Sequence, residues 1–430
     1  MIRPILIKGG RVIDPSRNTD GIADVYLADG KVASVGRNIV GEDGCQVIDA
    51  TGKVVAPGMI DLHVHLREPG QEDLETVATG AMSAAAGGFT AVCAMPNTDP
   101  VMDNQGTIGF VIAQAQKAAK ARVYPIGTIT LGQKGEKLSE MGELVGAGAV
   151  ALSDDGKPVM SSQMMRTALE YARTFGVPVA DHCEDMTLAH GGAMHEGIVS
   201  TRLGLKGIPA AAEEIMVARD IILAELTGGH VHLCHMSTRG SVALIRRAKE
   251  MGLKVTAEAT PHHFTLTHTA CEGYNTNAKM NPPLREDPDR EAIRQALKDG
   301  TIDVIATDHA PHHYDAKERE FDDAPNGILG LETAFGLTVT ELVTPGLLTL
   351  PQLFHRMSTH PARIFNLPGG TLAIGAPADV AIFDPAIEWV VDPKKFFSKS
   401  RNTPFGGRKL TGRCELTIVR GRVVYDIATS

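Results

Sequence analysis

Apolar and polar positions follow a repeating strand-then-helix pattern through the middle of the chain. Short apolar runs predict buried strands, and segments with apolar residues every three to four positions predict helices. The expected strands are 59–66, 90–95, 122–128, 149–153, 178–181, 230–235, 254–259 and 304–307. The expected helices between them include 73–86, 104–119, 162–174, 210–226 and 239–251. Such alternation predicts a parallel sheet with outer helices, and eight repeats match a (β/α)8 TIM-like barrel better than a doubly wound sheet.

The two ends of the chain are patterned differently. Short apolar runs separated by glycine-containing turns predict a β meander at each end. These runs are 5–7, 11–13, 24–27 and 31–35 near the N-terminus, and 378–383, 416–419 and 422–425 near the C-terminus. Neither end has enough strands for a core of its own. We therefore predict an α/β protein with a barrel at 58–368 and one small β-sandwich domain that residues 1–57 and 369–430 build together.

Composition limits the class of partner. The 430 residues carry a net charge of −9 with 22% charged residues, which argues against a nucleic-acid-binding protein. No stretch has the length of a membrane span, and the N-terminus enters a strand without a signal-peptide pattern. The six cysteines are scattered without a C-x-x-C motif, which fits a reducing compartment. We therefore expect a cytoplasmic protein that acts on a small molecule and binds neither nucleic acid nor membrane.

Two histidines spaced by two, His63 and His65, end the first predicted strand of the barrel. Side chains at i and i+2 project from the same face of a strand, and imidazole is a common metal ligand. An isolated pair of this kind more often only lines a polar face. In a (β/α)8 barrel, however, the C-terminal ends of the strands carry the chemistry.

Four other predicted strands also end in residues that bind metals. These endings are Ser-Asp-Asp-Gly at 153–156, Asp-His-Cys-Glu at 181–184, His-Leu-Cys-His-Met-Ser at 232–237 and Thr-Asp-His-Ala-Pro-His at 307–312. Four histidines and two carboxylates exceed the needs of one catalytic zinc and suit two ions that share a carboxylate. Such a centre activates water for hydrolysis or formation of an amide-type bond. The pattern does not decide whether Asp154 or Asp155 points inward.

Several longer motifs carry a family resemblance. They are D-x-H-x-H-x-R-E-P-G at 61–70, G-G-F-T at 87–90, M-P-N-T at 95–98, D-D-G at 154–156, N-P-P-L-R at 281–285 and T-D-H-A-P-H at 307–312. With these motifs the chain resembles, over essentially its whole length, the class I bacterial dihydroorotases of the amidohydrolase superfamily. Many members of that superfamily bridge their metals with a carboxylated lysine. This chain offers only aspartates at 154–155, because Lys157 lies beyond the turn.

The resemblance implies two zinc ions per chain and a set of residues around them. The implied metal ligands are His63, His65, Asp155, His182, His235 and Asp308. The first two histidines would hold one ion and the other two the second, with Asp155 as the bridge, and Asp308 would also be the catalytic proton shuttle. The implied substrate contacts are His65, Arg67, Asn97, Asn281, His312, Asn326 and Gly327.

By this resemblance the chain would catalyse the reversible cyclisation of N-carbamoyl-L-aspartate to (S)-dihydroorotate and water in pyrimidine biosynthesis. Arg67 would hold the substrate carboxylate in a bidentate pair, and an ordinary surface arginine at the strand end is the alternative. A hydantoinase or allantoinase would share the barrel and metals but needs no such clamp. A third alternative is a non-catalytic subunit of a carbamoyltransferase complex, which would be expected to have lost ligands. A homodimer and an association with aspartate carbamoyltransferase are the expected protein partners.

The segment 313–327 is polar, charged and without apolar periodicity. A solvated connection is one interpretation of such a segment. Because it follows the strand that carries Asp308 and leads to a helix at 329–342, we expect it instead to lie beside the metals and to cover them as a lid.

Overall fold

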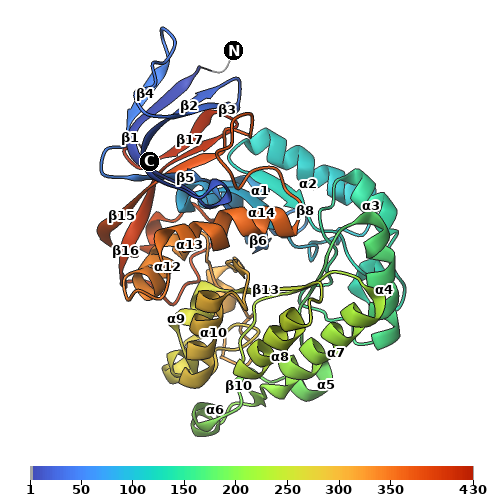
Figure 1. Ribbon diagram of the computed structural model, residues 1–430. Coiled ribbons are helices and arrows are strands. Elements are labelled where there is room, and N and C mark those ends of the chain that lie inside the picture. The colour runs from blue at the N-terminus through green and yellow to red at the C-terminus, as the bar shows by residue number, and fades with distance from the viewer. Residues whose placement is uncertain (1–2, 430) are drawn as a thin grey trace.

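The computed structural model describes residues 3–429, which form a barrel of parallel strands and a separate sheet beside it (Figure 1). The barrel strands are β6 (Met59–Val64), β7 (Phe89–Ala94), β8 (Arg122–Pro125), β9 (Val179–Asp181), β12 (Val231–Leu233), β13 (Val255–Ala259) and β14 (Val304–Ile305). They pair in parallel as two ladders, β6-β7-β8 and β9-β12-β13-β14. Seven of the expected strands are therefore present, in the expected order.

Single bridges close these ladders into a ring. Leu152 pairs in parallel with both Gly127 and Val179, so it joins the end of one ladder to the start of the other. Val64 pairs in the same way with His309 and completes the circle. The strand expected at 149–153 thus appears only as these bridges. Its backbone still hydrogen-bonds to both neighbouring strands, through Val150 N–H to Pro125 O at 3.1 Å and Leu152 N–H to Pro178 O at 3.1 Å.

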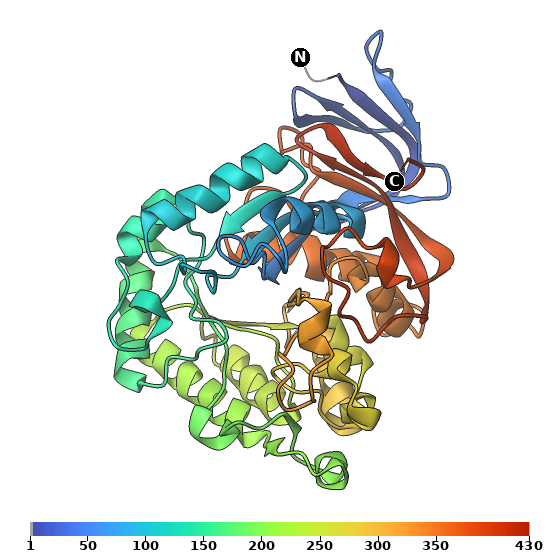
Figure 2. The same ribbon diagram turned by 180° about the vertical axis from the view of Figure 1, so that it is seen from behind.

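Helices surround the barrel (Figure 1 and Figure 2). The longer ones are α1 (Val77–Gly87), α2 (Gln105–Ala118), α3 (Met141–Ala147), α4 (Ser162–Phe175), α7 (Ala211–Thr227), α8 (Arg239–Glu250) and α10 (Asp287–Asp299). Four of the five expected helices agree with these bounds to within one residue at each end. The first begins at Val77 instead of 73, because the Thr76 hydroxyl accepts the Thr79 N–H and caps the helix there.

Short elements connect the strands and helices. The short helices are α5 (Met186–Ala189), α6 (Ile198–Leu203), α9 (Pro261–Thr265), α11 (Tyr314–Lys317), α12 (Ala334–Thr338), α13 (Leu350–Phe354) and α14 (His360–Ile364). Two π-helical turns, η5 (Val339–Val343) and η6 (His355–Thr359), continue α12 and α13. The 3-10 turns are η1 (Pro15–Arg17), η2 (Leu131–Gln133), η3 (His268–Tyr274), η4 (Thr276–Ala278) and η7 (Pro393–Lys395), and β10 (Met194–His195) pairs with β11 (Gly207–Ile208).

The two chain ends form one sheet of eight strands, in the order β17-β16-β15-β5-β1-β2-β3 with β4 beside β1. Its strands are β1 (Ile5–Asp14), β2 (Thr19–Ala28), β3 (Lys31–Gly36), β4 (Gln46–Asp49), β5 (Val54–Pro57), β15 (Val380–Val390), β16 (Lys409–Val419) and β17 (Arg422–Asp426). The expectation that both ends share one β domain is confirmed. Its ladder is continuous through the β5–β15 pairing, and both ends contribute side chains, such as Val25 and Val380, to one apolar core.

The segment 313–327 has ordered structure of its own. It contains the short helix α11, and Phe321 is buried in an apolar cluster. Lys317 is buried as well, and its ammonium donates to the carbonyls of Thr276, Lys279 and Pro325. Burial lowers the pKa of this lysine to about 7. The interpretation as a solvated connection therefore does not hold, because a long apolar stem with three backbone acceptors orders the segment. Its covering role stays a prediction.

The helix expected at 329–342 begins only at Ala334, since the preceding residues run past the barrel as a turn. Among residues 3–429, no helix combines the length and the apolar character that crossing a membrane requires.

Candidate active site

A cavity of about 210 Å³ opens at the C-terminal ends of the barrel strands. Its lining residues are His65, Arg67, Asn97, Asp155, Gly156, His182, His235, Asn281, Asp308, Ala310, His312, Asn326 and Gly327. Twelve residues were expected at the site from the sequence, and eleven of them line this cavity. The twelfth, His63, lies behind it and is completely buried. The fold therefore brings together residues that are up to 264 positions apart in the chain.

Asp155 lies at the centre of four imidazole rings. Its oxygens are 3.5 Å from His63 Nε2, 3.5 Å from His65 Nε2, 3.6 Å from His182 Nδ1 and 3.5 Å from His235 Nε2. Each histidine thus turns one ring nitrogen toward the same carboxylate, although the four come from three different strand ends.

Asp154 lies close in sequence but points elsewhere. Its carboxylate accepts the N–H groups of Ile129 and Thr130 at 2.8 and 3.1 Å, together with the Thr130 hydroxyl. Of the two aspartates, only Asp155 lies among the histidines. The structure therefore distinguishes Asp155 from Asp154, which the sequence pattern could not do.

Asp308 completes one side of the cluster. Its Oδ1 lies 3.1 Å from His65 Nε2 and 3.5 Å from His63 Nε2. Burial acts to raise the pKa of this carboxyl, but the neighbouring His63 and His65 outweigh it and hold the pKa well below its ordinary value. Asp308 is therefore a carboxylate at neutral pH and can accept a proton.

The cluster fits metal ions. His63 Nε2 and Asp155 Oδ1 are buried and have no hydrogen-bond partner, an arrangement that is costly unless something else satisfies these atoms. Two ligands at about 2.0–2.2 Å from one tetrahedral ion lie roughly 3.3–3.6 Å apart, which agrees with the nitrogen–oxygen distances around Asp155. Three groups of potential ligands contain His63: one with Asp155 and His235, one with His65 and Asp308, and one with Cys234 and Glu258.

Glu258 supports this cluster and was not identified from the sequence. Its Oε1 accepts His63 Nδ1–H at 2.7 Å and the His235 N–H at 3.1 Å, and its Oε2 accepts His232 Nε2–H at 3.1 Å. Burial opposes ionisation, but the charges and hydrogen bonds of His63 and His232 lower the pKa of Glu258 to about 2. The donated Nδ1–H fixes the tautomer of His63 that leaves Nε2 free. The signal in the sequence was a single charged residue in the apolar strand 255–259.

The second histidine pair has a similar support. The His182 Nε2–H donates to Glu184 Oε2 at 3.1 Å, which leaves Nδ1 for the cluster. Asn281 donates its amide N–H to the same Glu184 oxygen at 2.8 Å. In the first histidine pair, Asn97 Oδ1 accepts His65 Nδ1–H at 2.9 Å. Two of the expected substrate residues, Asn97 and Asn281, therefore also orient histidines or their partners.

Arg67 lines the cavity next to the histidines. It is buried to 8% exposure, and its Nε–H donates to Pro311 O at 3.2 Å. Burial lowers the pKa of this guanidinium to about 10, so it remains charged at neutral pH. Among the described residues its Nη1 has no hydrogen-bond acceptor. Arg67 thus presents a fixed positive charge to the cavity and is not a solvated surface arginine.

His312 and the backbone at 326–327 line the cavity beside Arg67, whose Nη2 lies 3.4 Å from His312 Nε2. Burial and the charge of Arg67 lower the pKa of His312 to about 2, so the ring is neutral and its Nε2–H donates to Asn326 O at 2.7 Å. Gly327 has a φ of 120° and lies so near Ala310 that an added Cβ would approach the Ala310 Cβ to 2.6 Å. Only glycine fits here.

Three residues of the site have the left-handed backbone conformation that side chains other than glycine rarely adopt. They are Arg67 with a φ of 64°, His235 with 38° and Asp308 with 49°. Each lies two or three residues beyond the end of a barrel strand. Strain of this kind gathers at functional sites, where the surrounding fold holds a side chain in a direction that regular structure would not give it.

Solved structures with the same architecture define the class of protein. The L-hydantoinase (dihydropyrimidinase) from Arthrobacter aurescens superposes with a TM-score of 0.89 at 27% identity, over 99% of this chain and 96% of that one. A D-hydantoinase (dihydropyrimidinase) from a Thermus species matches with a TM-score of 0.84 at 27% identity, over 98% and 95% of the two chains. Fold and site together define an enzyme of the amidohydrolase barrel class.

Sequence relatives narrow the class to a family. A family model described as dihydro-orotase-like matches residues 52–241. The dihydroorotase of Anaeromyxobacter dehalogenans (strain 2CP-1) is 57% identical over 424 residues, and that of Pelotomaculum thermopropionicum is 58% identical over 422, each over 98% of both chains. The chain belongs to the dihydroorotase family.

Proposed function

We propose that this protein is a dihydroorotase, a cyclic amide hydrolase that interconverts N-carbamoyl-L-aspartate and (S)-dihydroorotate plus water in pyrimidine biosynthesis. The observation that carries the proposal is the buried Arg67 guanidinium beside the histidine–aspartate cluster in one cavity. A cluster of this kind suits amide chemistry, and a fixed guanidinium suits a substrate that keeps a carboxylate in both its open and its closed form.

The cluster would hold two zinc ions. The nitrogen-rich ligand set favours zinc over magnesium. His63 and His65 would hold one ion, His182 and His235 the other, and Asp155 would lie between them. When bound, these ions lower the pKa of a water molecule and polarise a carbonyl. The unpartnered Nε2 of His63 and Oδ1 of Asp155 support this assignment.

The remaining residues would bind and position the substrate. Arg67 would pair with the ring carboxylate of dihydroorotate, with Asn97 and Asn281 beside it. His312 is neutral and would act as a hydrogen-bonding group, while the backbone at 326–327 would cover the ring.

Asp308 would move the proton. In hydrolysis its carboxylate accepts a proton from the attacking water and returns it to the ring nitrogen as the ring C–N bond breaks. In the reverse direction the same group takes the proton from the attacking amide nitrogen and gives it to the departing oxygen. Its ionised state and its place in the cavity wall support this role.

The test is turnover by zinc-loaded protein, followed through the ultraviolet absorbance of dihydroorotate as N-carbamoyl-L-aspartate is added. Hydantoin and dihydrouracil serve as competing substrates without a carboxylate. Asp308→Asn should keep bound zinc but lose turnover, because an amide cannot exchange the proton. Equal or faster turnover of hydantoin would identify a hydantoinase, and no turnover of any substrate by metal-loaded protein would identify a non-catalytic subunit.

The ligand set weighs against a non-catalytic subunit, since every expected metal ligand is present in the cluster. The six cysteines are free and five of them are buried, which supports a cytoplasmic location. The homodimer and the association with aspartate carbamoyltransferase stay predictions, for which sedimentation of the protein alone and with that enzyme is the measurement.

A further inference from the structure

We propose that Asn402, from the C-terminal part of the chain, is the positioning residue that sets the substrate-facing wall of the cavity. Asn402 does not line the cavity, and it lies between η7 and β16 of the terminal sheet. It is buried to 4% exposure. The inference rests on the proposed function, because it concerns the loops that would contact the substrate.

The side chain of Asn402 holds two separate loops at once. Its Nδ2 donates to Ala310 O at 2.9 Å and to Gly327 O at 3.1 Å, and its Oδ1 accepts the His312 N–H at 3.1 Å. Its backbone carbonyl also accepts the Leu329 N–H at 2.9 Å. Both amide protons and the amide oxygen are thus used on the backbone of cavity-lining segments. No other amino acid offers two donors and an acceptor in this compact form except the longer glutamine.

Asn402 can act as a fixed point only because the segment around it is itself anchored. We call residues 396–405 the C-terminal strap. Its first part is held by two carboxylates from the barrel: Glu332 accepts the Phe397 N–H at 2.8 Å, and Glu75 accepts the Lys399 N–H at 3.2 Å and the Ser398 hydroxyl.

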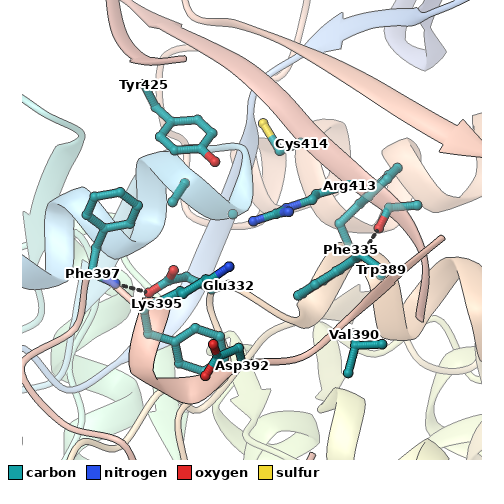
Figure 3. Close-up of a pocket in the computed structure, with 15 residues that line it drawn as sticks. Glu332, Phe335, Trp389, Val390, Asp392, Lys395, Phe397, Arg413, Cys414 and Tyr425 are labelled. Atoms are coloured by element: carbon teal, nitrogen blue, oxygen red, sulfur yellow. Dashed lines mark hydrogen bonds between the residues drawn. The ribbon is translucent and has the colours of Figure 1, made fainter. Parts of the chain in front are cut away.

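Figure 3 shows Glu332 bonded to the Phe397 N–H, in a small cavity of about 100 Å³ that Tyr425 of the terminal sheet also lines. At the other end of the strap, Phe405 is buried in the same apolar cluster as Ile328 and Leu329, which directly follow the loop at 326–327. The strap is therefore fixed on both sides of Asn402.

Different parts of the fold position the metal ligands and the substrate-facing wall. The barrel strands and Glu258 hold the four metal-binding histidines, and among the described residues no hydrogen bond joins the strap to any of these histidines. The strap holds the backbone of 310–312 and 327, which faces the substrate. Loss of the Asn402 amide should therefore weaken substrate binding and leave the metals in place. A displaced wall loses contacts that the bound substrate and the transition state share, so KM rises while kcat stays near its wild-type value.

The experiment compares Asn402→Ala with the wild-type protein in metal content, steady-state kinetics with dihydroorotate and amide hydrogen exchange. We expect unchanged zinc, KM raised on the order of tenfold, kcat within about threefold, and faster exchange at 310–312 and 327–329. Asn402→Asp keeps the acceptor for His312 but places an oxygen against two carbonyls, so its KM should rise at least as far.

Asn104→Ala is the matched control. Asn104 also uses its side-chain amide on backbone, where it accepts the Gly106 and Thr107 N–H groups and caps α2, but it has no contact with the cavity wall. Its loss should lower Tm without a change in KM. If both Asn402 variants lower Tm as the control does and leave KM and exchange at 310–312 unaltered, Asn402 is only structural and the proposal is overturned.

The proposed function can fail independently. In that case the wild-type protein does not turn over dihydroorotate, and the exchange measurement on metal-loaded protein still decides the role of Asn402. If Asn402→Ala does not fold, Ser398→Ala removes the hydroxyl that donates to Glu75 and accepts the Ser400 N–H, and it should give a smaller rise in KM in the same direction.

Discussion

Replacement of Arg67 by methionine should distinguish a dihydroorotase from its hydantoin-cleaving relatives. Methionine keeps most of the apolar stem of arginine and removes the guanidinium. From the structure we expect a larger effect on substrates that carry a carboxylate than on substrates that lack one. Arg67 remains charged at neutral pH, is buried to 8% exposure, donates to Pro311 O and lines the cavity.

The size of the effect follows from the bonds that are lost. A hydrogen bond to a charged group contributes about 1.5–3 kcal/mol, and a bidentate pair loses two of them with partial compensation by water. We expect kcat/KM for dihydroorotate to fall by about 2–4 kcal/mol, which is roughly 30-fold to 900-fold. The substitution also leaves the Pro311 carbonyl without its donor, and this cost is the same for every substrate.

Dihydrouracil separates the loss of the carboxylate contact from the cost shared by every substrate, because it has the ring but no carboxylate. Its kcat/KM should fall by less than about fivefold, so the ratio of the two substrates reports the carboxylate contact alone. Arg285→Met is the matched control: Arg285 is buried to 4% exposure and donates to Ile208 O and Ser237, but it does not line the cavity. Equal losses for both substrates in Arg67→Met would show that Arg67 serves the fold and would refute the reasoning.

Four further predictions concern the metals, their support, the covering segment and pH. His182→Ala should bind one zinc ion fewer than wild type by elemental analysis, and an unchanged content would contradict the two-ion assignment. Glu258→Gln should weaken zinc binding about 10- to 100-fold in a chelator competition, because it weakens the partner of His63. Asp303→Asn, which changes a buried carboxylate that directly precedes β14 and accepts the Ala257 N–H, should not. Trypsin should cleave the free protein first after the exposed Arg319 and not after the buried Lys317, and dihydroorotate should slow this cleavage. Equal rates with and without ligand would exclude a covering role. Ring closure turns a dicarboxylate into a monocarboxylate and consumes one proton, so the equilibrium ratio of dihydroorotate to N-carbamoyl-L-aspartate should fall about tenfold per pH unit near neutrality, as chromatography of equilibrated mixtures would measure.

The sequence alone determined the architecture and the residues of the cavity. Hydrophobic periodicity is a local property, because burial of one face repeats every two residues in a strand and every three to four in a helix. It therefore located the strands of the barrel and placed their C-terminal ends beside His63, His182 and Asp308. In a barrel those ends meet on one face, so the pattern alone predicted that distant residues would gather there.

Only the tertiary structure decided which side chain of each group faces the cavity and what holds it there. Asp154 and Asp155 are equivalent in pattern, and the backbone N–H groups of a neighbouring loop draw Asp154 away. Glu258 and Asn402 carry no periodic signal either. Asn402 contacts residues 75 and 92 positions earlier in the chain, through hydrogen bonds that have no counterpart in local patterning. Such contacts depend on where loops pass each other in space, and that is set by the packing of the whole fold.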